Sequence, residues 1–303
     1  MVLELFENKK LVKICAPMVR YSKLPFRLLV RKYGCDLAFT PMIISDSFIQ
    51  APKARDIEFT TCDADQPLIV QFAAHNSTDF ATAAELVAST CNGVDLNCGC
   101  PQKWAMQQGY GACLINKPEL LRDVVLQTRN RIPSNDFTVS IKIRIHPEIR
   151  KTVELCQQVE AAGLSFLTVH GRTKDQRSDP VNLEGVKLIK ESVRVPVIAN
   201  GDICSLQDAE HVRQITNVNG VMSARGILEN PAMFAGFSET PIECIKDWMK
   251  LSLETGISFT HFHHHLIYMC EKNMSRVDRR YFNALSSTTA VIDYMENYLS
   301  LCE

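Results

Sequence analysis

The stretch Thr138-Val-Ser-Ile-Lys-Ile-Arg144 alternates polar and apolar side chains along one candidate β-strand. Successive side chains of a strand point to opposite faces, so the three apolar residues share one face and Lys142 and Arg144 share the other. A lysine inside a parallel strand is hard to explain in an open sheet, because such strands are usually apolar on both faces. The alternation therefore favours a barrel strand with a polar inner face, and the alternative is that Lys142 lies in a surface loop.

Seven further runs share this β-rich character and end at or within a few residues of a Gly, Pro, Asn or Asp. Segments with apolar residues spaced by three and four, typical of amphipathic helices, separate them. Eight alternating units in about 230 residues predict an α/β fold, a (β/α)8 TIM barrel over residues 1–235. The eight runs are KICAPM (13–18), LAFTPM (37–42), LIVQFA (68–73), GVDLNCG (93–99), TVSIKIR (138–144), FLTVHG (166–171), VPVIANG (195–201) and GVMSARG (220–226).

The pattern changes after Phe234. Three stretches, 241–256, 259–274 and 280–302, read as helices with no strand between them. We therefore expect residues 236–303 to form a small all-helical C-terminal domain.

Composition sets further limits on the class of protein. The chain has 303 residues, 46% of them hydrophobic, and a net charge of -1, which argues against a surface built entirely for nucleic acid. Residues 1–13 show no signal-peptide pattern and no apolar run is long enough to cross a bilayer, so we expect no membrane association and a cytosolic or nuclear location. In that reducing environment the twelve cysteines are expected to be mostly buried thiols.

Polar side chains at the ends of the strands are the candidates for function, because TIM-barrel active sites lie at the carboxyl ends of the strands. His170 and Arg172, with Lys142 on the neighbouring strand, are expected to form a cationic cluster. The polar residues on the same faces are Gln71, Asp95, Asn97, Lys142, His170, Arg172, Asn200 and Asp202.

Two glycine-containing turns follow the last two strands, Asn200-Gly201-Asp202 and Ala224-Arg225-Gly226. TIM barrels commonly bind a phosphate at this place through backbone N–H groups. The pair of turns, together with the cation of Arg225, predicts a phosphate-bearing ligand.

The segment VDLNCGCP (94–101) holds two cysteines with different expected roles. Cys98 shares the helix-facing parity of Val94 and is expected to be a packed structural thiol. Cys100 follows the strand end in a loop over the barrel mouth, where a thiol can meet a substrate. A zinc site needs about four ligands, and Cys-x-Cys alone does not provide them. His261 and His265 lack the glutamate of the zinc-protease motif, so no metal is expected.

Taken together, these motifs resemble the tRNA-dihydrouridine synthase family, and most closely its eukaryotic class acting on positions 20a and 20b of the tRNA D-loop. The resemblance runs nearly end to end. It rests on CAPMVRYSKLPFR, TPMI, DLNCGCPQKWAMQQGYGACL, SIKIRIH, VHGRT, PVIANGDI, GVMSARGILENPAMF and FNALSS.

The resemblance implies an FMN-dependent oxidoreductase that uses NADPH or NADH to reduce the C5–C6 double bond of a tRNA uridine. Cys100 falls on the catalytic cysteine, which would protonate the uracil ring while the flavin supplies a hydride. Asn97 and Arg172 would bind substrate. The cofactor would be bound by Pro17, Met18, Val19, Gln71, Lys142, His170, Asn200, Gly201, Asp202, Ala224 and Arg225.

Two other interpretations stay open: a flavin barrel acting on a small pyrimidine, and a catalytically silent RNA-binding paralogue. The tRNA contacts are expected in the helical domain and after the first strand, and the alternative is that these cations lie on an ordinary solvated surface. Residues 236–303 hold six Lys+Arg against nine Asp+Glu, so an RNA surface there must be a clustered stripe. The candidate residues are Arg20, Lys23, Arg27, Lys272, Arg276, Arg279 and Arg280.

Overall fold

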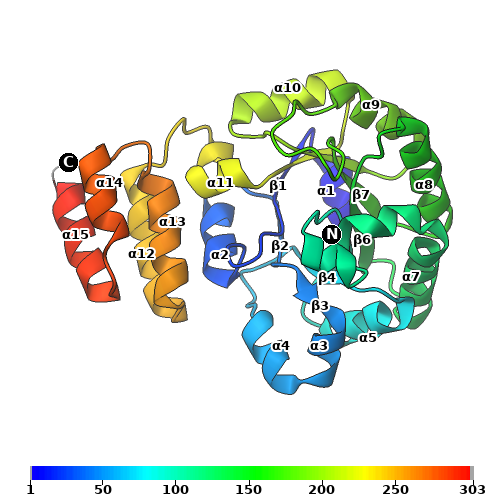
Figure 1. The fold of residues 1–303 in the computed structure, drawn as a ribbon, viewed down its shortest axis with the longest axis horizontal. Helices are drawn as coiled ribbons and strands as arrows, with labels where there is room; N and C mark the ends of the chain where they lie inside the picture. Colours follow the sequence, from blue (N-terminus) through cyan, green and yellow to red (C-terminus); the bar gives the residue numbers. More distant parts are fainter. Residues whose placement is uncertain (1, 301–303) are drawn as a thin grey trace.

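A computed structural model describes residues 2–300, in which eight parallel strands close into a barrel (Figure 1). Strand β1 pairs with both β2 and β9, and β2 pairs with β4, so the sheet has no open edge between them. The (β/α)8 prediction is confirmed. The barrel strands are β1 (Val12–Cys15), β2 (Leu37–Phe39), β4 (Leu68–Ala73), β5 (Gly93–Cys98), β6 (Thr138–Arg144), β7 (Phe166–His170), β8 (Val197–Asn200) and β9 (Gly220–Ser223).

The second predicted strand is interrupted. The run 37–42 ends as β2 at Phe39, and the chain resumes as β3 (Ile43–Ile44), which pairs with the end of β4. Pro41 lies in the interruption, and a proline has no N–H to donate to a sheet.

Helices surround the barrel in the order that the sequence pattern predicts (Figure 1). The patterns did not predict α1 (Val2–Asn8), whose Val2 and Phe6 pack with Phe166 inside the amino-terminal end of the barrel. The other helices around the barrel are α2 (Leu24–Lys32), α3 (Ser45–Gln50), α4 (Pro52–Glu58), α5 (Ser77–Val87), α6 (Lys103–Gln107), η1 (Gly111–Asn116), α7 (Pro118–Arg131), α8 (Ile149–Ala161), α9 (Leu183–Ser192), α10 (Leu206–Thr216), α11 (Arg225–Glu229) and η2 (Met233–Ala235).

Four C-terminal helices lie beside the barrel (Figure 1): α12 (Ile242–Thr255), α13 (Phe259–Cys270), α14 (Arg276–Asn283) and α15 (Thr288–Ser300). Helix α12 packs on α2 and α13 on α11, while α14 and α15 pack on the far side of α13. Buried aromatic rings join the two parts. Phe26 of α2 stacks on His265 with ring centroids 4.4 Å apart and meets Trp248 edge-on at 6.2 Å. The predicted stretch 280–302 divides into α14 and α15, and its last two residues lie outside the described range.

The two faces of the strands carry different chemistry, as the alternation in β6 predicts. Val139, Ile141 and Ile143 are buried between the sheet and the helices, whereas the deeper part of the lumen is filled by apolar residues such as Phe39 and Ile198. This leaves the polar residues at the carboxyl end of the barrel. Within residues 2–300, no helix is both long and apolar enough to cross a membrane.

Candidate active site

The strand register brings the predicted polar residues to common levels of the barrel. Asn97 on β5 lies opposite Lys142 on β6, and one level higher His170 on β7 lies opposite both Arg144 and Asn200. Residues far apart in the sequence therefore meet at one mouth, at the end of the barrel where TIM-barrel enzymes place their active sites.

A chain of hydrogen bonds runs from the barrel interior to the thiol loop. The Asn97 side-chain nitrogen donates to the Gln71 amide oxygen at 2.8 Å. The Asn97 oxygen accepts from the backbone N–H of Cys100 at 3.0 Å and from that of Gly99 at 3.2 Å. Asn97 thus fixes the start of the loop that holds Cys100, whose thiol side chain is half-buried.

Asp95 lies fully buried beneath this chain of bonds. Gln71 and the Ser140 hydroxyl each donate to its carboxylate at 2.8 Å. Burial raises the pKa of Asp95 to about 6, although these two hydrogen bonds oppose the shift. The alternation of side chains in residues 94–98 predicts that Asp95 points into the barrel, on the same face as Asn97.

Lys142 is the inward cation of β6. Its ammonium makes no hydrogen bond or ion pair with any residue from 2 to 300. Burial lowers the pKa of Lys142 to about 8, while Asp95 and Cys100 act in the opposite direction. A half-buried, unpaired cation at the mouth is suited to bind polar atoms of a ligand.

His170 does not contribute to a cationic cluster, and this part of the prediction is wrong. Burial, together with the positive charges of Lys142, Arg144 and Arg172, lowers the pKa of His170 to about 2. The imidazole is therefore neutral at physiological pH, because neighbouring cations disfavour another positive charge.

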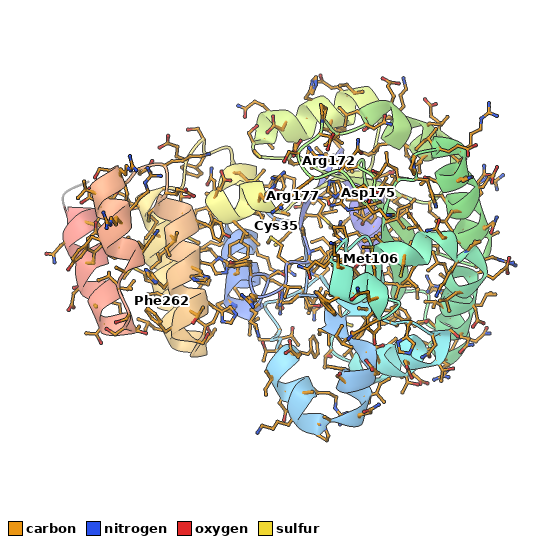
Figure 2. The ribbon with its side chains drawn as sticks, in the orientation of Figure 1. Cys35, Met106, Arg172, Asp175, Arg177 and Phe262 are labelled. Carbon is orange, nitrogen blue, oxygen red and sulfur yellow. The ribbon has the colours of Figure 1, made fainter. Side chains whose placement is uncertain are left out.

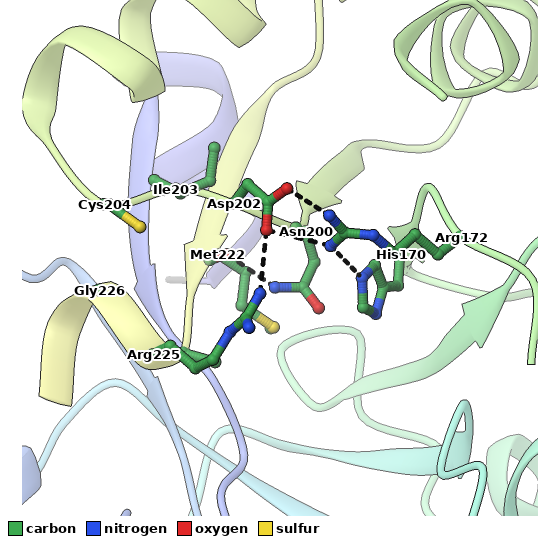
Figure 3. A pocket seen from close by; sticks show the side chains of 11 residues that line it. His170, Arg172, Asn200, Asp202, Ile203, Cys204, Met222, Arg225 and Gly226 are labelled. Atoms are coloured by element: carbon green, nitrogen blue, oxygen red, sulfur yellow. Dashed lines mark hydrogen bonds and ion pairs between the residues drawn. The ribbon is translucent and has the colours of Figure 1, made fainter. Parts of the chain in front are cut away.

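The turns after β8 and β9 form a pocket whose lining includes His170, Asn200, Gly201, Ala224, Arg225 and Gly226. Figure 3 shows the side chains of His170 and Arg225 on opposite sides of it. Gly201 has φ +127°, and a β-carbon there would lie 2.8 Å from Val181 Cγ2. Only glycine fits such a turn without strain. Asn200 is held by donating to the Met222 carbonyl at 2.8 Å.

Two arginines share the carboxylate of Asp202 beside this pocket (Figure 3). Arg172 donates from both terminal nitrogens, one to Oδ1 at 3.1 Å, and Arg225 donates to Oδ1 at 3.0 Å. The hydrogen bond from Arg172 holds the pKa of Asp202 below its usual range. Arg172 is only 2% exposed, whereas the Arg225 side chain faces solvent.

The long loop after β7, residues 171–182, passes over the barrel and is tied down by arginines. Arg144 donates to the carbonyls of Thr173 at 2.8 Å and Gln176 at 3.1 Å, and Arg172 donates to that of Asp179. Figure 2 shows Arg172, Asp175 and Arg177 along this loop. Neither the anchoring role of Arg144 nor the exposed Arg177 was predicted, because a loop leaves no periodic signal in the sequence.

The prediction that Cys98, the last residue of β5, is a packed thiol is confirmed. Cys98 is fully buried, and burial raises the pKa of its thiol well above the usual range. No disulfide joins the cysteines within residues 2–300, and no cluster of metal-binding side chains occurs in that range. His265 of α13 is instead packed between Phe26 and Trp248.

The remaining predicted residues are more dispersed. Pro17 and Met18 follow β1 at the mouth and are half-buried, while Val19 is 55% exposed in an adjacent apolar groove. The prediction that Arg27 contacts RNA is wrong. Its guanidinium is buried and donates to Asp65 at 2.7 Å, because α2 turns this residue toward the core.

The other candidate RNA contacts lie on the surface. Arg20 is exposed and Lys23 is half-buried. In the C-terminal helices, Arg276 and Arg280 are exposed without an ion pair among residues 2–300, whereas Lys272 pairs with Glu229 at 3.1 Å and Arg279 pairs with Glu271 at 3.8 Å.

Fold and site together define a (β/α)8 barrel with a thiol loop, an inward lysine and a glycine-turn pocket at its mouth. The family model described as dihydrouridine synthase (Dus) matches residues 14–299. The chain belongs to the dihydrouridine synthase family.

Two relatives illustrate the similarity. A Homo sapiens protein named tRNA-dihydrouridine(20a/20b) synthase (NAD(P)+)-like is 57% identical over 99% of this chain and 94% of its own length. A Schizosaccharomyces pombe protein named tRNA-dihydrouridine(20a/20b) synthase (NAD(P)+) is 40% identical, covering 98% of this chain and 90% of its own. Among solved structures, the old yellow enzyme from Trypanosoma cruzi has the same fold, with a TM-score of 0.53 and 11% identity, covering 72% of this chain and 85% of its own.

Proposed function

We propose that the protein is a flavin-dependent tRNA-dihydrouridine synthase, which reduces the C5–C6 double bond of a D-loop uridine at positions 20a and 20b with NADPH or NADH. The observation that carries the proposal is the hydrogen bond from the Cys100 N–H to the Asn97 side-chain oxygen. It fixes Cys100 at the mouth of the barrel, close enough to Lys142 for the two side chains to interact electrostatically. Membership in the dihydrouridine synthase family supports the reaction, and the names of the relatives support the position.

The residues present fit FMN. The pocket of Gly201, Ala224 and Arg225 provides backbone N–H groups and a solvent-facing guanidinium, which suit a phosphate. The carboxylate of Asp202 would repel a phosphate, so we assign its side chain to holding the two arginines. Asn200 and the neutral His170 would then bind the polyol chain.

The ring of the cofactor would lie nearer the centre of the mouth, where Pro17, Met18, Gln71 and Lys142 converge. The unpaired ammonium of Lys142 would bind polar ring atoms and stabilise negative charge there. When bound, the flavin supplies the two electrons that reduce uracil, and NADPH or NADH replenishes them.

Cys100 would provide the proton that the reduced uracil requires. Its side chain is half-buried in a loop beside the mouth, and Asn97 fixes the backbone on which it sits. Asn97 would face the uracil from the same level of the barrel. We assign Arg172 a positioning role, because it is buried and bound to Asp202 and Asp179.

The uridine must leave the stack of its neighbours to reach this depth. The helices α12–α15 would help bind the tRNA outside the barrel through Arg276 and Arg280, which are exposed and have no ion pair among residues 2–300. Together these features favour tRNA over a free pyrimidine.

The test is a visible absorption spectrum of the purified protein under anaerobic conditions. A flavin band that bleaches with NADPH and returns with tRNA lacking dihydrouridine is expected. In Cys100→Ala the band should bleach but not return, whereas Cys113→Ala, another half-buried thiol nearby, should behave as wild type.

Other results would contradict the proposal. Reoxidation by free uracil or orotate and not by tRNA would indicate a small-pyrimidine reductase. Absence of flavin after attempted reconstitution with FMN would indicate a silent paralogue, and normal turnover by Cys100→Ala would remove the thiol from the chemistry.

A further inference from the structure

An apolar groove opens beside the thiol loop and is not used by the function proposed above. We call it the Trp104 groove. Its walls come from the β1–α2 loop, β3, α3, α4 and α6, and include Val19, Met42, Ile44, Phe48, Gln102 and Trp104.

The Trp104 groove adjoins the loop that holds Cys100. Met42 and Ile44, on its floor, pack in the same apolar cluster as Cys100. Trp104 itself lies four residues after Cys100, in the first turn of α6. The groove therefore lies next to the loop that holds the thiol.

The indole of Trp104 is held in place while much of it stays accessible. Trp104 is 44% exposed, and Val19, which lines the same groove, is 55% exposed. The indole N–H donates to the Gln102 side-chain oxygen at 2.6 Å. Because this bond lies at the edge of the ring, it restrains the indole without covering its faces.

Two cations lie next to groove residues in the chain, and one carboxylate, that of Glu58, lines the groove itself. Arg20 follows Val19 and Lys103 precedes Trp104, and both side chains are exposed without an ion pair among residues 2–300. A partly exposed indole, with exposed cations next to Trp104 and Val19 in the chain, suits a nucleotide, which presents a π-face and a phosphate. A purely apolar peptide would leave both cations unused.

We propose that the Trp104 groove binds a nucleobase next to the target uridine, stacked on the indole of Trp104. This inference rests on the proposed function. Extrusion of the uridine uncovers the face of a neighbouring base, and a protein aromatic ring can restore the lost stacking. Trp104 would thereby help determine which uridine of the D-loop enters the barrel.

The test compares wild type, Trp104→Ala and the conservative Trp104→Phe as flavin-loaded enzymes. Trp104→Ala should raise the KM for unmodified tRNA by about tenfold or more, as expected for one lost stacking contact. Trp104→Phe should restore most of the affinity. Flavin reduction by NADPH should be unchanged in both, and Leu86→Ala, at a similarly exposed position on α5, should have no effect.

Fluorescence gives a readout that does not depend on turnover. The chain has two tryptophans, and Trp248 is fully buried, so quenching by RNA reports on Trp104. Unmodified tRNA and a short single-stranded RNA should quench wild type but not Trp104→Phe. An abasic strand of equal length should not quench, because it has charge without bases.

The outcomes separate the two proposals. Normal KM in Trp104→Ala, with tRNA still reoxidising the flavin, would overturn the base site and leave the proposed function standing. If tRNA fails to reoxidise wild-type flavin, the proposed function fails, and the base site stands or falls by base-dependent quenching. Equal quenching by the abasic strand would indicate a charge contact only and overturn the stacking.

Discussion

Gly111 lies so close to Cys100 that a β-carbon added to it would be 2.5 Å from the Cys100 carbonyl oxygen and 3.0 Å from its Cβ. The same carbonyl accepts a hydrogen bond from the N–H of Ala112 at 2.9 Å. The backbone of Cys100 is thus held from two sides, by Asn97 before it and by the start of η1 after it.

Gly111→Ala should therefore lower tRNA turnover by about tenfold or more, because the new methyl group displaces Cys100 and positional errors near 1 Å are costly in catalysis. Flavin content and reduction by NADPH should stay normal. Gly109→Ala is the matched control. Gly109 also has a positive φ, +85°, but its nearest neighbour is the Cβ of His75 at 3.5 Å. If both variants lose turnover equally, the cause is backbone strain at a positive φ and not displacement of Cys100.

Much of this site follows from strand parity. The alternation in TVSIKIR places Lys142 and Arg144 inside the barrel, and that in VDLNC buries Cys98 while turning Asn97 inward. Parity is reliable here because every strand of a closed barrel is packed under helices on its outer face. The closure and the polar mouth were therefore predictable from local pattern.

The predictions for His170 and Arg27 were wrong because the charge or burial of each side chain depends on residues that are distant in the sequence. The neutral state of His170 results from burial and from three arginines and a lysine that meet only in the folded barrel. Arg27 has the sequence context of a surface cation, yet its partner Asp65 is 38 residues away. No local pattern encodes either contact.

Arg27→Ala should lower the free energy of unfolding by about 3–5 kcal/mol, the usual effect of removing one partner of a buried ion pair. The side chains of Arg27 and Asp65 are 2% and 0% exposed, and Arg27 also donates to the Ser22 carbonyl at 2.7 Å. Urea unfolding measures the loss. Lys32→Ala, which removes an exposed pair with Asp247, should change stability by less than about 1 kcal/mol.

His265 should make the protein sensitive to mild acid. Burial lowers its pKa to about 3, although the hydrogen bond to the Tyr21 carbonyl opposes the shift. The unfolded chain binds this proton below about pH 6.5 and the folded chain does not. The contribution to stability is therefore complete above pH 6.5 and is lost as the pH falls toward 3.

In the variant His265→Phe, the free energy of unfolding should fall less steeply as the pH is lowered, by up to about 1.4 kcal/mol per pH unit. It keeps the stacking on Phe26 but gives up the hydrogen bond, so it should be somewhat less stable at pH 7. Urea unfolding at pH 7, 6 and 5, followed by tryptophan fluorescence in a Trp104→Phe background, measures both effects, because the remaining Trp248 ring has its centroid 4.3 Å from that of His265. If the free energy of unfolding depends on pH with the same slope in wild type and in His265→Phe, His265 is not the source of the acid sensitivity.

The unpaired arginines of α14 should set part of the salt dependence of tRNA binding. Arg276 and Arg280 are four residues apart on one exposed face, in a region whose charge is otherwise acidic. Each cation that contacts phosphate releases counterions on binding. The double variant Arg276→Ala, Arg280→Ala should weaken binding at low salt and reduce the slope of log affinity against log salt by about two.

Lys10→Ala is the control for that experiment. Lys10 is exposed before β1, at the opposite end of the barrel from the mouth, so its removal changes net charge without touching the proposed RNA surface. Binding measured at several salt concentrations distinguishes the cases. If both variants lower affinity equally, long-range attraction and not local contact is responsible; if the arginine variant keeps the wild-type slope, the tRNA does not contact α14.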